Sequence, residues 1–284
     1  MFCASWEGRK KLYRVGIDAG TTVTKLAAVK DGVITDLFRV DSEPSDEDIK
    51  VLFDVFLERN KLTEADIESV NLTGVGATGF KEKIHGIKPE YVHEFEADVA
   101  GAEFIAEGEK EFLLISLGTG TAYIHVKDNK ATHVGGLGMG GGTVRGLSKY
   151  LAGTTDVKEL KTCAEAGSLS NVNLTMADVS KEKFDGLMGY LTASNFGKTE
   201  ADASRDDLVA GIYSLVIENV IQTGCMMAGQ MGIKTIVMIG GLCNSPELAK
   251  RIEIFKKMYT DFRFIIAKNG SYITAIGTAV SDAK

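Results

Sequence analysis

The first forty residues alternate short apolar runs with polar turns, which is the pattern of neighbouring β-strands. The stretch VGIDAGTTVTKLAAV (15–29) is an apolar run interrupted by Asp-Ala-Gly-Thr-Thr. It predicts a hairpin whose tip exposes backbone N–H and hydroxyl groups and can therefore hold a phosphate. GVITDLFRV (32–40) predicts a third strand, and PSDEDIKVLFDVFLERN (44–60) predicts a helix with a capping signal at Ser45 and Asp48.

Two further patterns complete a first lobe. IESVNLTGVGAT (67–78) predicts a buried strand that runs into a glycine-rich turn. YVHEFEADVAGAEFIAEG (91–108) predicts a short strand that enters a helix. The order β-β-β-α-β-α indicates one lobe over residues 1–109.

The same pattern then begins again. FLLISLGTGTAYIHV (112–126) has the features of the first hairpin, and aligning Gly20 with Gly118 and Thr21 with Thr119 leaves a common offset of 98 residues. This repetition predicts two related α/β lobes with a cleft between them, the second over residues 110–284. A nucleotide in that cleft would be held from both tips.

Three more segments characterise the second lobe. VGGLGMGGGTVRGLSKYL (134–151) predicts a glycine loop that approaches a ligand, followed by a helix whose amino end favours anions; a loop without a ligand is the alternative. DDLVAGIYSLVIENVIQTGCMMAGQ (206–230) predicts a helix of about 25 residues, either a core helix or part of a dimer interface. TIVMIGGLCNSPEL (235–248) predicts a strand, a Gly-Gly turn, and a helix capped by Asn244 or Ser245.

Composition narrows the classes of protein. With 284 residues, 44% of them hydrophobic and 25% charged, the chain is typical of a soluble globular protein, and its net charge of −7 argues against nucleic-acid binding. No amino-terminal leader is evident, and polar residues within 208–231 favour a buried helix over a membrane span, so we expect a cytoplasmic protein. The cysteines form no Cys-x-x-Cys pair, which disfavours a zinc ribbon, a redox motif or an iron–sulfur cluster: Cys3, Cys163, Cys225 and Cys243.

Together the motifs resemble those of the acetate and sugar kinase/Hsp70/actin superfamily, and within it the type II pantothenate kinases. The matching stretches run in family order from residue 16 to residue 279: GIDAGTTVTK, HEFEAD, SLGTGTA, VGGLGMGGGTVRGL, LTASNFGK, IGGLCNSP and NGSYITAIGTA. The resemblance implies a duplicated actin-like fold with ATP between the lobes. It also implies transfer of the ATP γ-phosphoryl group to pantothenate, the first step of coenzyme A biosynthesis, by a homodimer that coenzyme A or its thioesters inhibit.

The resemblance also assigns roles to residues. Asp18 would face Mg²⁺, and Glu94 matches the catalytic glutamate that accepts the hydroxyl proton, with Glu96 and Asp98 as close rivals. Solvated carboxylates in a first helical turn are the structural alternative. The residues assigned to ATP are Gly20, Thr21, Thr22 and Lys25 at the first tip, Gly118, Thr119, Gly120 and Thr121 at the second, Gly138, Gly140, Gly141 and Gly142 in the glycine loop, and Gly240 and Gly241 in the late turn.

One position departs from the family pattern. Where the family places an arginine before the VGG of the glycine loop, NKATHVGG has His133. Histidine is largely neutral at pH 7, whereas arginine is always charged, so stabilisation of the transition state comes into question. His133 could donate a hydrogen bond, Arg145 or Lys130 could supply the charge, or turnover could be slow. The residues expected at the substrate are Glu94, Thr119, Thr121, His133 and Arg145.

Other functions remain open on the sequence. A kinase of another small alcohol or an N-acetylhexosamine would use the same ATP residues. The zinc-containing sugar kinases and the ATP-dependent dehydratase activators need clustered cysteines that this chain lacks. A nucleotide or acyl-CoA sensor without catalysis is the alternative from a different class.

Overall fold

The computed structural model describes residues 12–20, 23–40, 46–106, 108–128, 130–180, 189, 191–198 and 202–281. The chain divides into two compact units. The first contains Met1–Gly108 and Tyr272–Lys284, and the second contains Glu109–Ser271. Ser45, Thr21 and Thr22 of the sequence predictions lie outside the described residues.

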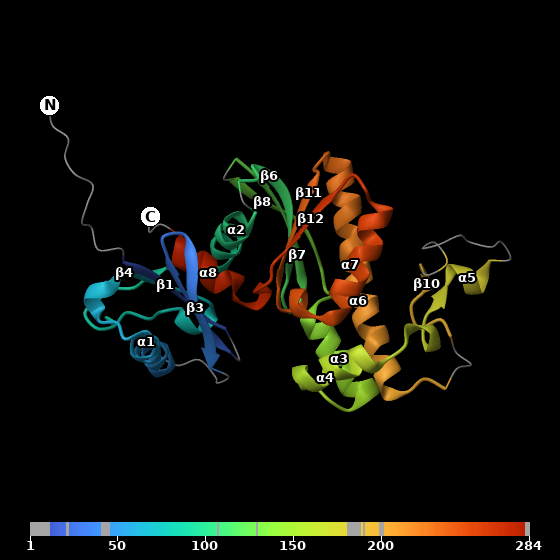
Figure 1. Ribbon diagram of the computed structural model, residues 1–284, viewed down its shortest axis with the longest axis horizontal. Coiled ribbons are helices and arrows are strands. Elements are labelled where there is room, and N and C mark those ends of the chain that lie inside the picture. Colours follow the sequence, from blue (N-terminus) through green and yellow to red (C-terminus); the bar gives the residue numbers. More distant parts are fainter. Residues whose placement is uncertain are drawn as a thin grey trace. The chain divides into compact units, whose positions relative to one another are not determined.

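The first unit is built on a five-stranded mixed sheet in the order β3-β2-β1-β4-β5 (Figure 1). The first three strands are antiparallel, and β4 and β5 continue the sheet in parallel with β1. The strands are β1 (Tyr13–Ala19), β2 (Thr24–Lys30), β3 (Val33–Val40), β4 (Ile67–Thr73) and β5 (Glu90–Tyr91). The predicted hairpin, third strand and later strands are therefore confirmed.

Helices cover both faces of this sheet because alternate residues of β1 point to opposite sides. Val15 and Ile17 pack against the apolar side of α1 (Asp46–Asn60) in one core. Gly16, between them, faces α8 (Ile273–Val280), and α2 (Glu94–Ile105) packs on α8.

The inclusion of α8 in the first unit differs from the predicted division, which gave residues 110–284 to the second lobe. The reason is close backbone packing: a β-carbon at Gly16 would lie 2.1 Å from the carbonyl oxygen of Ala275. Polar groups of the sheet also bind the carboxyl end of α8. Asn71 Nδ2 donates to the carbonyl oxygens of Thr278 and Ser281, both at 3.1 Å, and so satisfies groups that a helix end leaves without partners.

The second unit repeats the architecture of the first sheet. Its five-stranded sheet has the order β12-β11-β6-β7-β8, again with three antiparallel strands followed by two parallel ones (Figure 1). The strands are β6 (Glu111–Leu117), β7 (Thr121–Lys127), β8 (Lys130–Leu137), β11 (Thr235–Gly240) and β12 (Arg263–Ile266). This shared topology confirms the duplication that the two hairpins predict.

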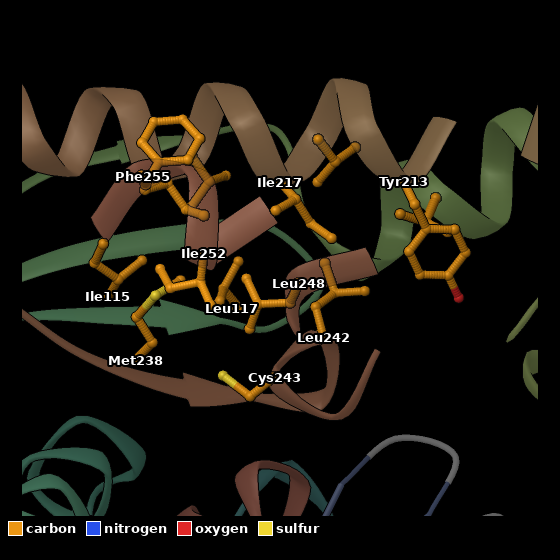
Figure 2. Close-up of a cluster of buried hydrophobic side chains, with 14 of the residues drawn as sticks. Ile115, Leu117, Tyr213, Ile217, Met238, Leu242, Cys243, Leu248, Ile252 and Phe255 are labelled. Carbon is orange, nitrogen blue, oxygen red and sulfur yellow. The ribbon is translucent and has the colours of Figure 1, made fainter. Parts of the chain in front are cut away.

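The core of the second unit lies between its sheet and a group of helices (Figure 2). Tyr213 and Ile217 of the long helix α6 meet Leu248 and Ile252 of α7 and Ile115 of the sheet. The helices are α3 (Gly141–Ala152), α4 (Val157–Ala166), α5 (Met176–Val179), α6 (Arg205–Met231) and α7 (Pro246–Met258); a short ribbon pairs β9 (Leu174–Thr175) with β10 (Thr192–Ser194).

The long helix predicted over 206–230 is α6, and the cap predicted after the Gly-Gly turn is Ser245, whose side chain accepts from Leu248 N with Pro246 in the first turn. Among the described residues α6 is also the one helix long and apolar enough to cross a membrane. Two thirds of its most apolar window is buried in the unit, so the helix packs as a core helix.

Only a short part of the glycine-rich stretch 134–151 forms a loop, although its composition predicts a longer one. Gly135 and Gly136 lie in β8, paired with Tyr123 and Ala122 of β7. The nonregular part is Gly138–Gly140, and α3 begins at Gly141. Pairing with β7 supplies hydrogen bonds that no local pattern in the sequence could indicate.

Candidate nucleotide and substrate site

The first hairpin brings together two of the predicted residues. Asp18 and Lys25 are register partners on β1 and β2, and Lys25 Nζ lies 3.0 Å from Asp18 Oδ2. Asp18 is buried, with 9% of its side chain exposed. The backbone N–H of Gly20 donates to Val23 O at 3.1 Å and closes the tip. A buried carboxylate with a lysine beside it suits a metal-bound phosphate, because Mg²⁺ is usually held by one or two carboxylates and by phosphate oxygens.

Sequence reasoning missed Gly74 as part of this end of the sheet. Gly74 follows β4 with φ of 89°, and a β-carbon there would lie 2.4 Å from Ala19 O and 3.0 Å from Asp18 Oδ1. A side chain at this position would therefore fill the space beside Asp18 Oδ1. The available signal was a glycine directly after a buried strand.

The second unit has the same feature in the predicted Gly240. It is the last residue of β11, with φ of 104°, and a β-carbon there would lie 2.2 Å from the carbonyl oxygen of Leu117, the last residue of β6. Because β11 is parallel to β6 with Gly240 opposite Leu117, the late turn and the Gly118 tip lie at one edge of the sheet. Gly241 begins a 3₁₀ turn beside it.

The second tip and the glycine loop pack directly on each other. The hydroxyl of Thr121 donates to Met139 O at 2.7 Å. A β-carbon at Gly140 would lie 2.6 Å from Gly120 O, and one at Gly142 would lie 2.7 Å from the side chain of Thr119. The structure therefore groups the second tip, the glycine loop and the late turn within one unit.

The sequence predicts that the amino end of α3 offers free N–H groups to an anion. In the structure, the first of these N–H groups donate to the hairpin tip instead. Gly141 N donates to Gly118 O at 2.8 Å, and Gly142 N donates to Thr119 O at 2.9 Å. The hairpin tip thus occupies the first two donors of the helix, which would otherwise lack partners. In this conformation these glycines shape the tip, and their N–H groups are already used.

The three carboxylates at the start of α2 have different surroundings. Glu94 and Glu96 are exposed in the first turn. Asp98 is half-buried and accepts a 2.8 Å hydrogen bond from Thr274 Oγ1 of α8. Among the described residues Glu94 makes no hydrogen bond or ion pair, so its carboxylate is available to a substrate.

His133, Arg145 and Lys130 all lie exposed on the second unit. His133 stands on the edge strand β8 opposite Ile124, and its Nε2 lies 3.9 Å from the position of a β-carbon at Gly136. Arg145 is in the second turn of α3, and Lys130 begins β8.

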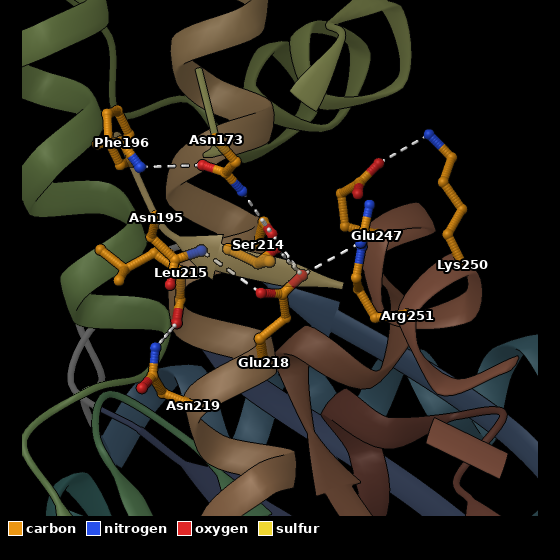
Figure 3. A network of polar contacts seen from close by, with 11 residues as sticks. Asn173, Asn195, Phe196, Ser214, Leu215, Glu218, Asn219, Glu247, Lys250 and Arg251 are labelled. Atoms are coloured by element: carbon orange, nitrogen blue, oxygen red, sulfur yellow. Dashed lines mark hydrogen bonds and ion pairs between the residues drawn. The ribbon is translucent and has the colours of Figure 1, made fainter. Parts of the chain in front are cut away.

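A pocket that the sequence did not indicate lies beside α6, and Figure 3 shows polar contacts made by residues of its wall. It has a volume of about 330 Å³ and includes the LTASN motif in its wall. Glu218 accepts hydrogen bonds from Thr192 at 3.1 Å and Ser214 at 2.8 Å, and it pairs with Arg251 at 3.1 Å. These contacts join β10, α6 and α7; the signal in the sequence was a glutamate in the middle of an apolar helix.

Comparison with known proteins gives a consistent set of similarities. Residues 109–281 match the family model described as Fumble. A protein of Bacillus cereus strain G9842 named "Type II pantothenate kinase" is 30% identical over 279 residues, covering 95% of this chain and 98% of that protein. A protein of Staphylococcus epidermidis with the same name is 26% identical over 272 residues, covering 93% and 98%.

A solved structure of the activator of 2-hydroxyisocaproyl-CoA dehydratase from Clostridium difficile, with bound ADPNP, has a TM-score of 0.62 at 17% identity and covers 94% of this chain and 93% of that chain. A ROK family glucokinase from Streptomyces griseus, in complex with glucose and AMPPNP, has a TM-score of 0.56 at 14% identity, covering 94% and 97%. At these identities the likeness concerns the fold alone, and it confirms the expected two-lobe, actin-like α/β class.

Proposed function

The chain belongs to the type II pantothenate kinase family, and on that premise we propose that it transfers the γ-phosphoryl group of ATP to the primary hydroxyl of pantothenate. The observation that carries the proposal is the alignment of relatives of that name with almost the whole chain, at 30% identity. The product, 4'-phosphopantothenate, is the first intermediate of coenzyme A biosynthesis.

The nucleotide is proposed to bind through the two hairpin tips. The space beside Asp18 Oδ1, which a side chain at Gly74 would fill, fits a magnesium ion held directly or through water. Lys25 would neutralise phosphate charge, and the tip residues Gly20, Thr21 and Thr22 would contact the phosphate oxygens. Mg²⁺-ATP supplies an activated γ-phosphoryl group, and the protein contributes positioning and charge stabilisation. The second set of proposed nucleotide residues comprises Gly118 to Thr121, Gly138, Gly140, Gly240 and Gly241, together with Gly141 and Gly142, which act by shaping the second tip.

Glu94 is proposed as the general base that accepts the proton of the pantothenate hydroxyl as the phosphoryl group is transferred. Its exposure, and the absence of a hydrogen bond or ion pair between its carboxylate and the described residues, support this role. Asp98 is a weaker candidate because Thr274 already binds it. Thr119, Thr121, His133 and Arg145 are proposed to orient the substrate, with His133 donating a hydrogen bond where the family has arginine.

The test measures ADP release in a coupled assay with and without pantothenate. Glu94→Gln should lower kcat by about 10²- to 10⁴-fold, the usual contribution of a general base, while ATP still binds. Glu96→Gln serves as the matched variant and should retain activity. ADP release that depends on a different alcohol would refute pantothenate as the substrate. A loss of activity in Glu96→Gln but not in Glu94→Gln would assign the role of general base to Glu96.

The family membership also motivates three proposals about the working protein. We propose a homodimer, a cytoplasmic location, and inhibition by coenzyme A or its thioesters. Exposed methionines on α6, such as Met226 at 58% exposure, offer apolar surface to a second copy. Light scattering of the purified protein and titration of the assay with coenzyme A check the first and third of these.

A further inference from the structure

The helix that carries Glu94 is fixed by its packing on α8. A β-carbon at Gly101 of α2 would lie 2.4 Å from Ile273 O, and one at Gly277 of α8 would lie 1.8 Å from Ala97 O. The two backbones are therefore in close contact at two levels. Such contacts fix the separation of the helices at these two levels.

A polar contact between the two helices opposes rotation of α2 about its own axis. The hydroxyl of Thr274 in the first turn of α8 donates to Asp98 Oδ1 at 2.8 Å. Asp98 follows Glu94 by four residues, so the two side chains are neighbours on one face of α2. Any rotation that separates Asp98 from Thr274 must also displace the carboxylate of Glu94.

We infer that Asp98 and Thr274 are positioning residues, which hold the proposed base Glu94 at the orientation that the reaction requires. A helix with its side chains has a radius of about 5–6 Å, so a rotation of about 10° moves a surface group by roughly 1 Å. A displacement of that size at reacting atoms can cost about 10²-fold in rate. The inference rests on the proposed role of Glu94.

The experiment uses the intact protein and the ADP assay with pantothenate. Thr274→Val keeps the shape of the side chain and removes the donor, and it should lower kcat by about tenfold or more while the KM values for ATP and pantothenate stay within about twofold. Thr274→Ser restores the hydroxyl and should return most of the lost kcat. Asp98→Asn, whose amide oxygen can still accept, should lose less than Asp98→Ala.

Thr278→Val is the matched control, because the Thr278 hydroxyl bonds within α8, to the carbonyl oxygen of Thr274 at 2.7 Å. It should keep the kcat of the wild type, and its melting temperature shows what a threonine-to-valine change in this helix does to stability. A double variant gives the decisive result: in a Glu94→Gln background Thr274→Val should have no further effect, since residues that act as one unit are not additive.

The outcomes separate the two proposals. No ADP release with pantothenate in the wild type refutes the function, and full activity in Glu94→Gln refutes the base. If both of those stand, wild-type kcat in Thr274→Val overturns the positioning role. An equal loss in Thr278→Val, or a full further loss in the Glu94→Gln background, overturns it as well.

Discussion

The contact between α2 and α8 predicts opposite effects for one substitution at two helical glycines. In Gly277→Ala the new β-carbon would lie 1.8 Å from Ala97 O and 2.6 Å from Gly101 N, whereas ordinary contact begins near 3.4 Å. The two helices would have to separate by roughly 1.5 Å. In Gly146→Ala, within α3, the new β-carbon meets nothing within 4 Å.

The magnitudes follow from these distances. Overpacking a tight site costs about 1–3 kcal/mol and sometimes more, and a backbone partner cannot relieve the clash by changing rotamer. Alanine regains up to about 1 kcal/mol through helix propensity, so a clash at the upper end of that range leaves Gly277→Ala with a net loss of about 2 kcal/mol of unfolding free energy. Gly146→Ala causes no clash and gains the helix propensity of alanine, so this variant should be more stable than the wild type by about 0.5–1 kcal/mol.

The assay is urea denaturation followed by far-ultraviolet circular dichroism. If the two units unfold in separate transitions, Gly277→Ala should shift the transition of the unit that contains α2 and α8. Wild-type stability in Gly277→Ala, or shifts of the same sign in both variants, would refute the close packing of α8 on α2. That result would also remove the structural basis of the α8 assignment to the first unit.

Two further predictions concern ionic contacts. The hydrogen bond from His85 to Asp54, together with the one to Glu64, raises the pKa of His85. The contribution of the protonated His85 to the unfolding free energy is therefore complete below the unfolded pKa near 6.5 and is lost as the pH rises through the folded pKa. The unfolding free energy should therefore fall as the pH rises above about 6.5, and more steeply in the wild type than in His85→Gln; parallel urea midpoints would contradict this. The Glu218–Arg251 pair is about 15% exposed, so Arg251→Met should cost about 2–3 kcal/mol by leaving a carboxylate without its cation, with partial recovery in the double variant Glu218→Gln/Arg251→Met. Lys256→Met, which breaks an exposed pair with Glu253, should cost less than about 1 kcal/mol in the same melts, and equal losses would disprove the difference in burial.

Local patterns in the sequence were sufficient for most of the secondary structure. Each hairpin is a short apolar run, a Gly/Thr turn and a second run, and its hydrogen bonds close within about 20 residues. The apolar length of α6 and the Ser245-Pro246 start of α7 are equally local signals. The similarity of the two hairpins also predicted the duplicated sheet, because equal patterns impose equal strand geometry.

Contacts between distant segments decided the rest. Asn71 and Gly16 bind α8 from more than 200 residues away, so no window of sequence could assign that helix to the first unit. Likewise, a glycine-rich sequence does not indicate whether its backbone N–H groups face a ligand or a neighbouring carbonyl group. Pairing with β7 placed Gly136 in a strand, and the Gly118 tip took the N–H of Gly141. Backbone hydrogen bonds are made wherever folding brings partners together, and that depends on the whole chain.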